Sequence, residues 1–148
     1  MLLDSASLSE YAEEISALGN PLFNGETSLF IKDIINNSQY KVFALLHEGH
    51  TAGFLILSTV LDEAEILEVA VSENLRRCGL GSEIMDEVLS WCVKNGILQI
   101  FLEVRESNFP ARAYYKKYGF IENGIRKGYY RNPAEDAVLM SKKIAVPF

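Results

Sequence analysis

Hydrophobic residues recur along this chain with two different spacings. The spacing changes from one to the other at positions where glycine, proline or asparagine interrupts the pattern. Apolar residues three or four apart predict helices, whereas alternating positions or short apolar runs predict strands. The pattern predicts helices over 7–18, 27–36, 79–94 and 108–118, and strands over 40–46, 51–61, 65–71, 98–104, 120–130 and 136–143. Ser7 or Ser9 is expected to cap the first helix. This order predicts a mixed α/β fold, with a three-strand meander before a helical crossover and residues 1–148 in a single domain.

The strand over 98–104 has one of the clearest patterns, because it is almost entirely apolar, as expected inside a sheet. Side chains alternate along a strand, so Glu103 is predicted to point away from the face shared by Leu102 and Val104. Its neighbours on that opposite face are Phe101 and Arg105. The sequence therefore places one carboxylate on the far side of an otherwise apolar strand.

Composition and charge narrow the function only a little. Of 148 residues, 49% are hydrophobic and 23% charged, which is an ordinary globular balance. The net charge of −6 disfavours nucleic acid as a partner and suits a cationic substrate. The start lacks a signal peptide pattern and no apolar run is long enough to span a bilayer, so we expect a cytoplasmic protein without a membrane partner. Cys78 and Cys92 are accordingly expected to be free thiols.

A glycine-rich segment, Arg76–Ser82, follows a predicted strand and opens a predicted helix. The first turn of a helix has backbone N–H groups without internal partners, and glycines let an anion approach them. Arg76 and Arg77 add positive charge that complements phosphate. The spacing fits neither the dinucleotide fingerprint nor the Walker loop. On spacing alone, a helix start with two flexible residues remains the alternative to a phosphate site.

The same segment matches a known signature, Gln/Arg-x-x-Gly-x-Gly/Ala. Further matching positions are 102–108, 111, 115, 119–120, 126, 129–130 and 135–137. Through these motifs, from about Leu61 to Met140, the chain resembles the GCN5-related N-acetyltransferase (GNAT) superfamily, and within it the bacterial ribosomal-protein-alanine N-acetyltransferases. The resemblance implies acetyl-CoA as cosubstrate. It also implies a GNAT fold, a mixed and mostly antiparallel central sheet of about six to seven strands flanked by about four helices.

The resemblance implies which residues hold acetyl-CoA. The pyrophosphate is expected on Arg76, Arg77, Cys78, Gly79, Leu80, Gly81 and Ser82, and the backbone of Val69, Ala70 and Val71 is expected beside the pantetheine amides. Asn108 resembles a further residue that contacts CoA. From the residues alone, Asn108 also suits the cap of the helix that begins there, and the two roles are compatible.

The resemblance also implies a catalytic pair, with Glu103 as proton acceptor and Tyr115 as proton donor to the departing thiolate. From pattern alone, Glu103 could be a solvated carboxylate paired with Arg105, and Tyr115 could be a packing residue. Glu65 and Glu68 are rivals for the role of base. In other members of the superfamily, the base resembles a glutamate at the position of Glu65. The alanine-specific enzymes often have asparagine at the position of Glu68.

The expected acceptor is a primary amine, most simply the N-terminal α-amine of a ribosomal protein that begins with alanine. Lysine, a small-molecule amine, or a CoA-binding module without turnover are the alternatives. We expect the acceptor to bind between the turn at Asn20–Glu26 and the loop at Tyr129–Asp136. Family members often have Phe-Pro-Trp-Ser near the first of these, whereas this chain reads Ala17–Phe23 without tryptophan, which leaves the acceptor peptide open.

Two histidines, His47 and His50, flank Glu48 and Gly49 in a predicted hairpin turn. A metal site needs more ligands at matching spacing than this turn offers. We therefore predict a solvated turn, and no metal site is expected in the chain.

Overall fold

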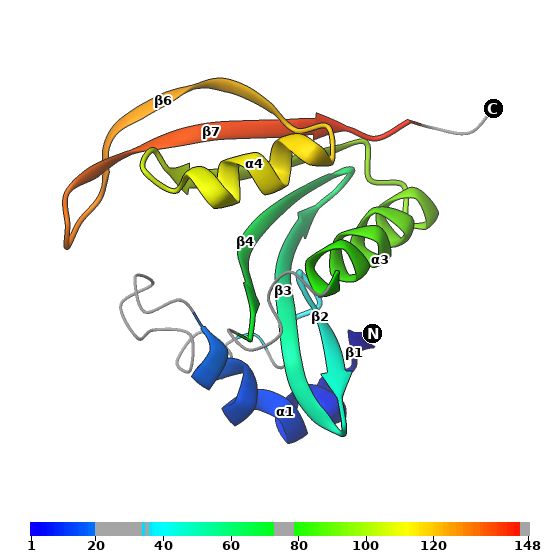
Figure 1. Ribbon diagram of the computed structural model, residues 1–148. Coiled ribbons are helices and arrows are strands. Elements are labelled where there is room, and N and C mark those ends of the chain that lie inside the picture. The colour runs from blue at the N-terminus through cyan, green and yellow to red at the C-terminus, as the bar shows by residue number, and fades with distance from the viewer. Residues whose placement is uncertain (20–33, 35, 73–78, 146–148) are drawn as a thin grey trace.

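The computed structural model describes residues 1–19, 34, 36–72 and 79–145 (Figure 1). The elements are β1 (Leu2–Leu3), α1 (Ser5–Leu18), β2 (Tyr40–His47), β3 (His50–Val60), β4 (Glu63–Val71), α3 (Leu80–Lys94), β5 (Gln99–Arg105), α4 (Phe109–Lys117), β6 (Ile121–Tyr130) and β7 (Glu135–Lys143). They form one seven-stranded sheet in the order β1-β2-β3-β4-β5-β7-β6. Only the β4–β5 pair is parallel, so the predicted mixed, mostly antiparallel fold is confirmed. The helix expected over 27–36 lies largely outside the described residues.

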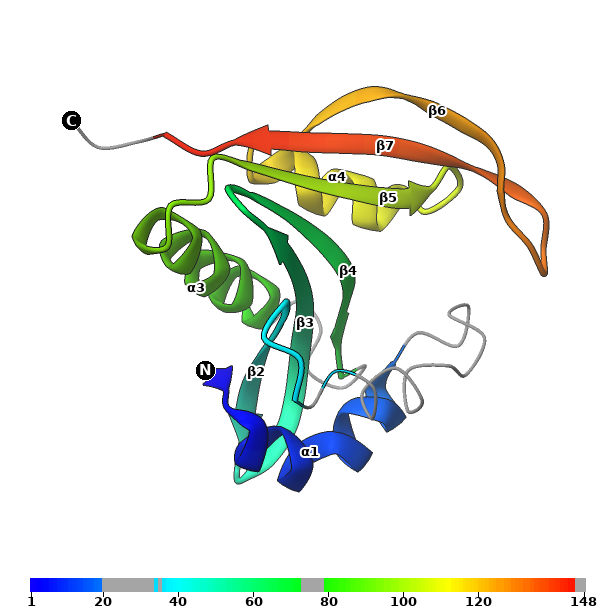
Figure 2. The ribbon, with the colours of Figure 1, turned by 180° about the vertical axis from the view of Figure 1, so that it is seen from behind.

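The helices cover the two faces of the sheet (Figure 2). The packing of α3 and α4 gives the larger core, in which Leu55, Ile84 and Ile100 are fully buried. On the other face, α1 packs over Phe54 and Ile56 of β3 in a second, smaller core. Adjacent residues of β3 thus enter opposite cores, which explains why this strand is one continuous apolar run.

The first helix begins earlier than predicted. Its cap is Asp4, whose carboxylate accepts a hydrogen bond of 2.8 Å from the Ser7 backbone N–H. The expectation that Ser7 or Ser9 caps α1 is therefore wrong. Aspartate and serine cap equally well, and the pattern of apolar residues does not distinguish the three candidates.

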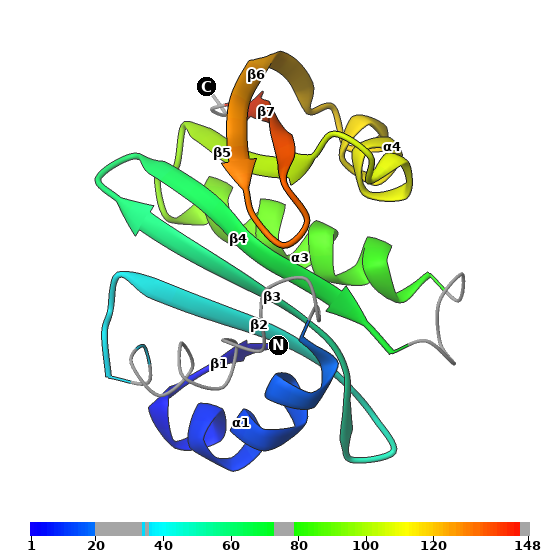
Figure 3. The ribbon, with the colours of Figure 1, turned by 90° about the vertical axis from the view of Figure 1, so that its left-hand side faces the viewer.

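The two parallel strands pair over only part of their length. Their ladder begins at Glu63 and Gln99 and ends at Ile66 and Leu102. Beyond it, β4 continues beside β3 while β5 continues beside β7, and the two strands diverge (Figures 1 and 3).

A β-bulge lies where this divergence begins. Ile66 pairs with Leu57 of β3 and Glu68 pairs with Ile56, so Leu67 is the extra residue. A bulge shifts the alternation of side chains. Ile66 therefore packs in the larger core before the bulge, and Val69 packs against that core after it.

Candidate active site

A cavity of about 290 Å³ lies where β4 and β5 diverge. Of the residues predicted for the site, Val69, Glu103, Asn108 and Tyr115 all line it. They come from β4, from β5, and from the cap and second turn of α4. The divergence thus brings residues up to 46 positions apart in the sequence around one space.

Glu103 reaches the cavity as its strand pattern predicted. Leu102 and Val104 are buried in the larger core, and Glu103 points to the other face. The Glu103 carboxylate accepts a hydrogen bond of 3.1 Å from the Arg126 guanidinium, in an ion pair between β5 and β6. The suggested pairing with Arg105 is wrong, because Arg105 pairs instead with Glu135 at 3.4 Å.

Tyr129 is a second partner of Glu103. Its hydrogen bond to the Glu103 carboxylate is the main reason that the pKa of Tyr129 is raised to about 12, so this hydroxyl stays protonated at neutral pH. The Arg126 guanidinium also lies over the Tyr129 ring, 4.7 Å from its centroid. Arg126 and Tyr129 carried the family resemblance, but the sequence assigned them no contact, because β6 and β5 are neighbours only through β7.

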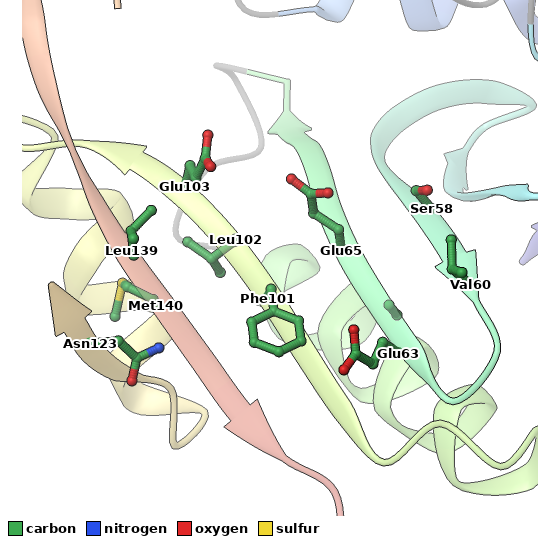
Figure 4. A pocket seen from close by; sticks show the side chains of 11 residues that line it. Ser58, Val60, Glu63, Glu65, Phe101, Leu102, Glu103, Asn123, Leu139 and Met140 are labelled. Carbon is green, nitrogen blue, oxygen red and sulfur yellow. The ribbon is translucent and has the colours of Figure 1, made fainter. Parts of the chain in front are cut away.

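Glu65 stands next to Glu103 on the same side of the sheet. Figure 4 shows the Glu65 carboxylate on β4 directed toward that of Glu103 on β5. Desolvation and, second, the negative charge of Glu103 raise the pKa of Glu65 above its usual value. A nearby negative charge disfavours the ionised form of a carboxylate, so Glu65 holds a proton more readily than an isolated glutamate does.

A second cavity, of about 490 Å³, continues from the first. Glu65 and Glu103 line both cavities, and Glu63 and Phe101 line only the second (Figure 4). The site is therefore an extended groove with carboxylates along it. Such a groove favours a cationic ligand.

Glu68, the other predicted rival, also lines the first cavity. It directly follows the bulge residue Leu67, and only 7% of its surface is exposed. The bulge therefore turns Glu68 inward, while Glu65 stays accessible from the groove. Both rivals reach the site, and they do so in different surroundings.

Tyr115 lies deep in the wall of the cavity, and 6% of its surface is exposed. Its ring packs edge to face on Phe120 with centroids 5.6 Å apart. Burial, and second the neighbouring Tyr130, raise the pKa of Tyr115 above its usual value. The phenol is therefore neutral at physiological pH and can donate a proton.

Asn108 has the capping role that the sequence allowed. Its side-chain oxygen accepts a hydrogen bond of 3.2 Å from the Ala111 backbone N–H at the start of α4. The same residue lines the cavity. The cap therefore fixes the orientation of a side chain that faces the site.

The start of α3 contains the described part of the predicted phosphate site. Gly79 caps the helix in a left-handed conformation with φ of 81°, which favours glycine. A side chain on Gly81 would come within 3.3 Å of the Tyr114 ring. Arg76, Arg77 and Cys78 lie outside the described residues, so the structure gives no account of them.

Two contacts join this helix start to α4. The Tyr114 hydroxyl donates to the carbonyl of Gly81 at 2.7 Å, and the Lys117 ammonium lies 3.5 Å from the Ser82 hydroxyl. The sequence suggested only packing for Tyr114 and nothing for Lys117. Side chains three or four residues apart on one helix lie on the same face. The three-residue spacing of Tyr114 and Lys117 is therefore the signal that could have linked them.

Some sequence expectations lie outside this site. His50 forms a 2.9 Å contact with Glu14 on the surface, and Cys92 is a free, buried thiol. Within the described residues, no three metal-binding side chains come together. The helices of the same residues include none with the length and apolar character needed to cross a membrane.

Comparison with known proteins agrees with this geometry. The sequence model of the acetyltransferase (GNAT) family matches residues 9–120. Ribosomal protein bS18-alanine N-acetyltransferases from Escherichia coli K12 and Haemophilus influenzae are 37% and 38% identical, over 73% and 70% of this chain and 74% and 72% of their own. The crystal structure of the Escherichia coli ribosomal-protein-S18-alanine N-acetyltransferase superposes with a TM-score of 0.84 at 31% identity, over 100% of this chain and 96% of that one.

The chain belongs to the GNAT family of acetyltransferases. It is an acetyl-CoA-dependent N-acetyltransferase, as the sequence predicted.

Proposed function

We propose that the enzyme acetylates the N-terminal α-amine of a ribosomal protein that begins with alanine. The observation that carries this proposal is the meeting of Glu103 and Tyr115 at one cavity between the diverging strands β4 and β5. The names of the relatives support the acceptor, since they act on alanine of ribosomal protein bS18. The proposed place of action is the cytoplasm.

Proton transfers by the two residues account for the chemistry. Glu103 accepts a proton from the acceptor ammonium, and the neutral amine attacks the acetyl carbonyl carbon. The new N–C bond forms, the C–S bond to CoA breaks, and the nitrogen loses its second proton to solvent, from which the Tyr115 phenolate is reprotonated after it has given its proton to sulfur. Tyr115 donates its proton to the departing sulfur, for which its neutral, buried phenol is suited.

On the cofactor side of the cleft, the backbone of β4 and the start of α3 would both contact acetyl-CoA. The backbone of Val69, Ala70 and Val71 would run along the pantetheine arm, with Asn108 at its side. The start of α3 from Gly79 to Ser82 would hold the pyrophosphate, together with the preceding residues 76–78. Acetyl-CoA supplies the activated acetyl group as a thioester.

The chemistry favours an α-amine over lysine. With a pKa near 8, roughly a tenth of α-amines are neutral at pH 7, against about one lysine in a few thousand. An α-amine therefore depends less on the base than a lysine amine does. Glu103, whose carboxylate is already bound by Arg126 and Tyr129, suits such an acceptor. The carboxylate-lined groove beyond Glu65 offers space for the residues that follow it.

Acetylation of lysine or a small amine is the second candidate, and Glu65 is the observation that favours it. Its raised pKa makes it a stronger base than an ordinary glutamate. The two functions are separated by comparing the acetylation of peptides that have a free N-terminal α-amine but no lysine with that of N-terminally blocked peptides that contain lysine. If lysine is the acceptor, Glu65→Gln is expected to reduce its acetylation more than Glu103→Gln does.

The experiment measures free thiol released from acetyl-CoA with alanine-initiated basic peptides and with free amines. Tyr115→Phe is expected to lower turnover at least about a hundredfold, with CoA affinity retained. Tyr118→Phe is the matched control at the C-cap of the same helix, because the buried Tyr118 hydroxyl has no hydrogen-bond partner among the described residues. Near-normal turnover of Tyr115→Phe would remove this residue from the mechanism. Binding of CoA without thiol release from any amine would instead indicate a non-catalytic CoA-binding module.

A further inference from the structure

Arg105, at the end of β5, is a buried cation with only 7% of its surface exposed. Its guanidinium donates to the carbonyl oxygens of Pro133 at 2.9 Å and Arg131 at 3.3 Å. It also lies 4.4 Å from the centroid of the Tyr130 ring. All these contacts are with the segment 129–135, which is defined here as the hairpin tip between β6 and β7.

Glu135 completes this connection from the other end of the tip. One carboxylate oxygen accepts from Arg105 at 3.4 Å, and the other accepts from the Ser107 backbone N–H at 2.6 Å. The carboxylate therefore bridges the tip to the segment just after β5. The bonds from Ser107, and then from Arg105, hold the pKa of Glu135 below its usual range, so the bridge is charged at neutral pH.

The tip has little support from the sheet itself. The register between β6 and β7 shifts between Arg126 and Tyr130, so Tyr129 falls in an irregular stretch. The residues of β6 are exposed from Ile121 to Tyr129. Neither a regular ladder nor apolar packing therefore fixes the position of Tyr129.

The same tip forms a wall of the catalytic cavity. Tyr129 and Tyr130 both line the cavity that contains Glu103 and Tyr115. The hydroxyl of Tyr129 bonds to Glu103, and Tyr130 lines the same cavity as Tyr115. A displacement of the tip would therefore alter the surroundings of both proposed catalytic groups.

We infer that Arg105 is a positioning residue, which holds the hairpin tip so that Tyr129 and Tyr130 form the acceptor wall of the cleft. This inference rests on the proposed function of the cleft. Arg105 acts through the tip and not on the reacting atoms. Arginine is required because its planar fork serves two carbonyls, a carboxylate and a ring face at once, which the single ammonium of lysine cannot do.

The test replaces Arg105 with lysine and measures the acceptor and cofactor constants separately. Arg105→Lys is expected to raise the acceptor KM about tenfold or more and to change kcat less, with the Kd for CoA within about twofold of wild type. Glu135→Gln is expected to act in the same direction more weakly, and it replaces Arg105→Lys if that variant does not fold. An unchanged acceptor KM in both variants would overturn the inference.

Arg112→Lys is the matched control. Arg112 also donates through its fork, to Glu122 at 2.8 Å and to the Glu106 carbonyl at 2.7 Å, but it does so away from the tip. It is expected to lower stability without changing the acceptor KM. A purely structural role of Arg105 predicts the same result for both arginines, so a shared lack of effect on KM argues against positioning.

Amide hydrogen exchange tests the inference independently of turnover. In the free enzyme, Arg105→Lys is expected to speed exchange at residues 126–135 at least about tenfold relative to β2 and β3. Equal exchange in wild type and variant would overturn the role of Arg105 even if acetylation is confirmed. If wild type acetylates no amine, the proposed function fails, and the exchange result still decides whether Arg105 holds the tip.

Discussion

The two long hairpins of this enzyme are stabilised in different ways. In the β2–β3 hairpin, Glu48 and Gly49 form a tight turn with φ of 52° and 80°, which matches the twist of the flanking strands. Residues 51–57 of β3 are all buried. In the β6–β7 hairpin, β6 is exposed and the register shifts twice. The first hairpin thus depends on packing, and the second has little packing on its outer strand.

Polar contacts replace that packing in the β6–β7 hairpin. Glu122 pairs with Arg112 and Lys116 of α4 at 2.8 Å and 3.0 Å. Asn123 donates to the Ser141 hydroxyl at 2.7 Å, and Arg105 holds the tip. The more exposed ion pairs of Glu122 position side chains while each adding about 1 kcal/mol or less to stability.

This difference between apolar packing and polar contacts matches the different roles of the two hairpins. The packed hairpin supplies the frame on which β4 is placed. The polar hairpin carries Tyr129 and Tyr130 to the cleft and Arg126 to Glu103. Parts of a protein that move or bind ligands tend to come from its less stable elements. The comparison therefore predicts large effects on stability in β3 and large effects on activity in β6.

The largest expected effect is on folding, from truncation of Phe54 in β3. Phe54 is fully buried in the smaller core, so Phe54→Ala is expected to lower the free energy of unfolding by about 3–5 kcal/mol. Ile125 in β6 is 52% exposed, and Ile125→Ala is expected to change it by about 0.5 kcal/mol or less. Urea unfolding measures both. Similar losses in the two variants would contradict the comparison.

The second effect is on activity, from removal of the Tyr129 hydroxyl. Tyr129→Phe deletes the hydrogen bond to Glu103, and such a bond to a charged group supports a fall in kcat/KM of about tenfold. The urea midpoint is expected to stay within error of wild type. Tyr11→Phe in α1, which packs against the smaller core, is the control. Wild-type kcat/KM in Tyr129→Phe would show that the hydroxyl does not serve the reaction.

How much could be predicted from the sequence also differs between the hairpins. The turn at Glu48–Gly49 and its flanking strands follow from apolar runs and a glycine, which are local signals. Every predicted strand occurs in the structure within two residues of its expected bounds. The two-residue strand Leu2–Leu3 was missed, because it exists only through pairing with Val42 and Phe43 of β2.

The site was predicted only in part, because its contacts are long-range. Glu103 and Asn108 could be placed from strand alternation and helix capping, which are local. The ion pair of Glu103 with Arg126 and the anchoring by Arg105 depend on the order β5-β7-β6. The inward turn of Glu68 depends on the bulge, which no residue pattern marked.

The third effect is a modest gain in acceptor affinity, from removal of Arg126. This guanidinium occupies the Glu103 carboxylate that an acceptor ammonium must reach, and its side chain is 59% exposed. Arg126→Gln is therefore expected to lower the KM of a cationic acceptor about threefold, as the pair contributes less than ~1 kcal/mol. Steady-state kinetics at low and high salt measures the change, which should be larger at low salt. A higher KM at both salt concentrations would mean that Arg126 helps to bind the acceptor instead of competing with it.

The smallest expected effect concerns the polar contact that joins α1 to the β2–β3 hairpin. This contact corresponds to the one that Arg105 makes with the β6–β7 hairpin. Glu14 of α1 accepts from the His50 ring at 2.9 Å and from the Thr51 backbone N–H at 2.6 Å.

The His50 contact, and then the Thr51 contacts, lower the pKa of Glu14 from 4.5 to about 2. A lowered pKa means that the contribution to stability is complete above pH 4.5 and is lost as the pH falls toward 2. Glu14→Gln is therefore expected to lower the urea midpoint slightly at pH 5–6, and this difference from wild type should shrink below pH 4.5. The exposed neighbour Glu13, changed to Gln, controls for the loss of one charge. A difference that stays constant down to pH 3 would mean that the ionised form of the Glu14 carboxylate is not what stabilises the hairpin.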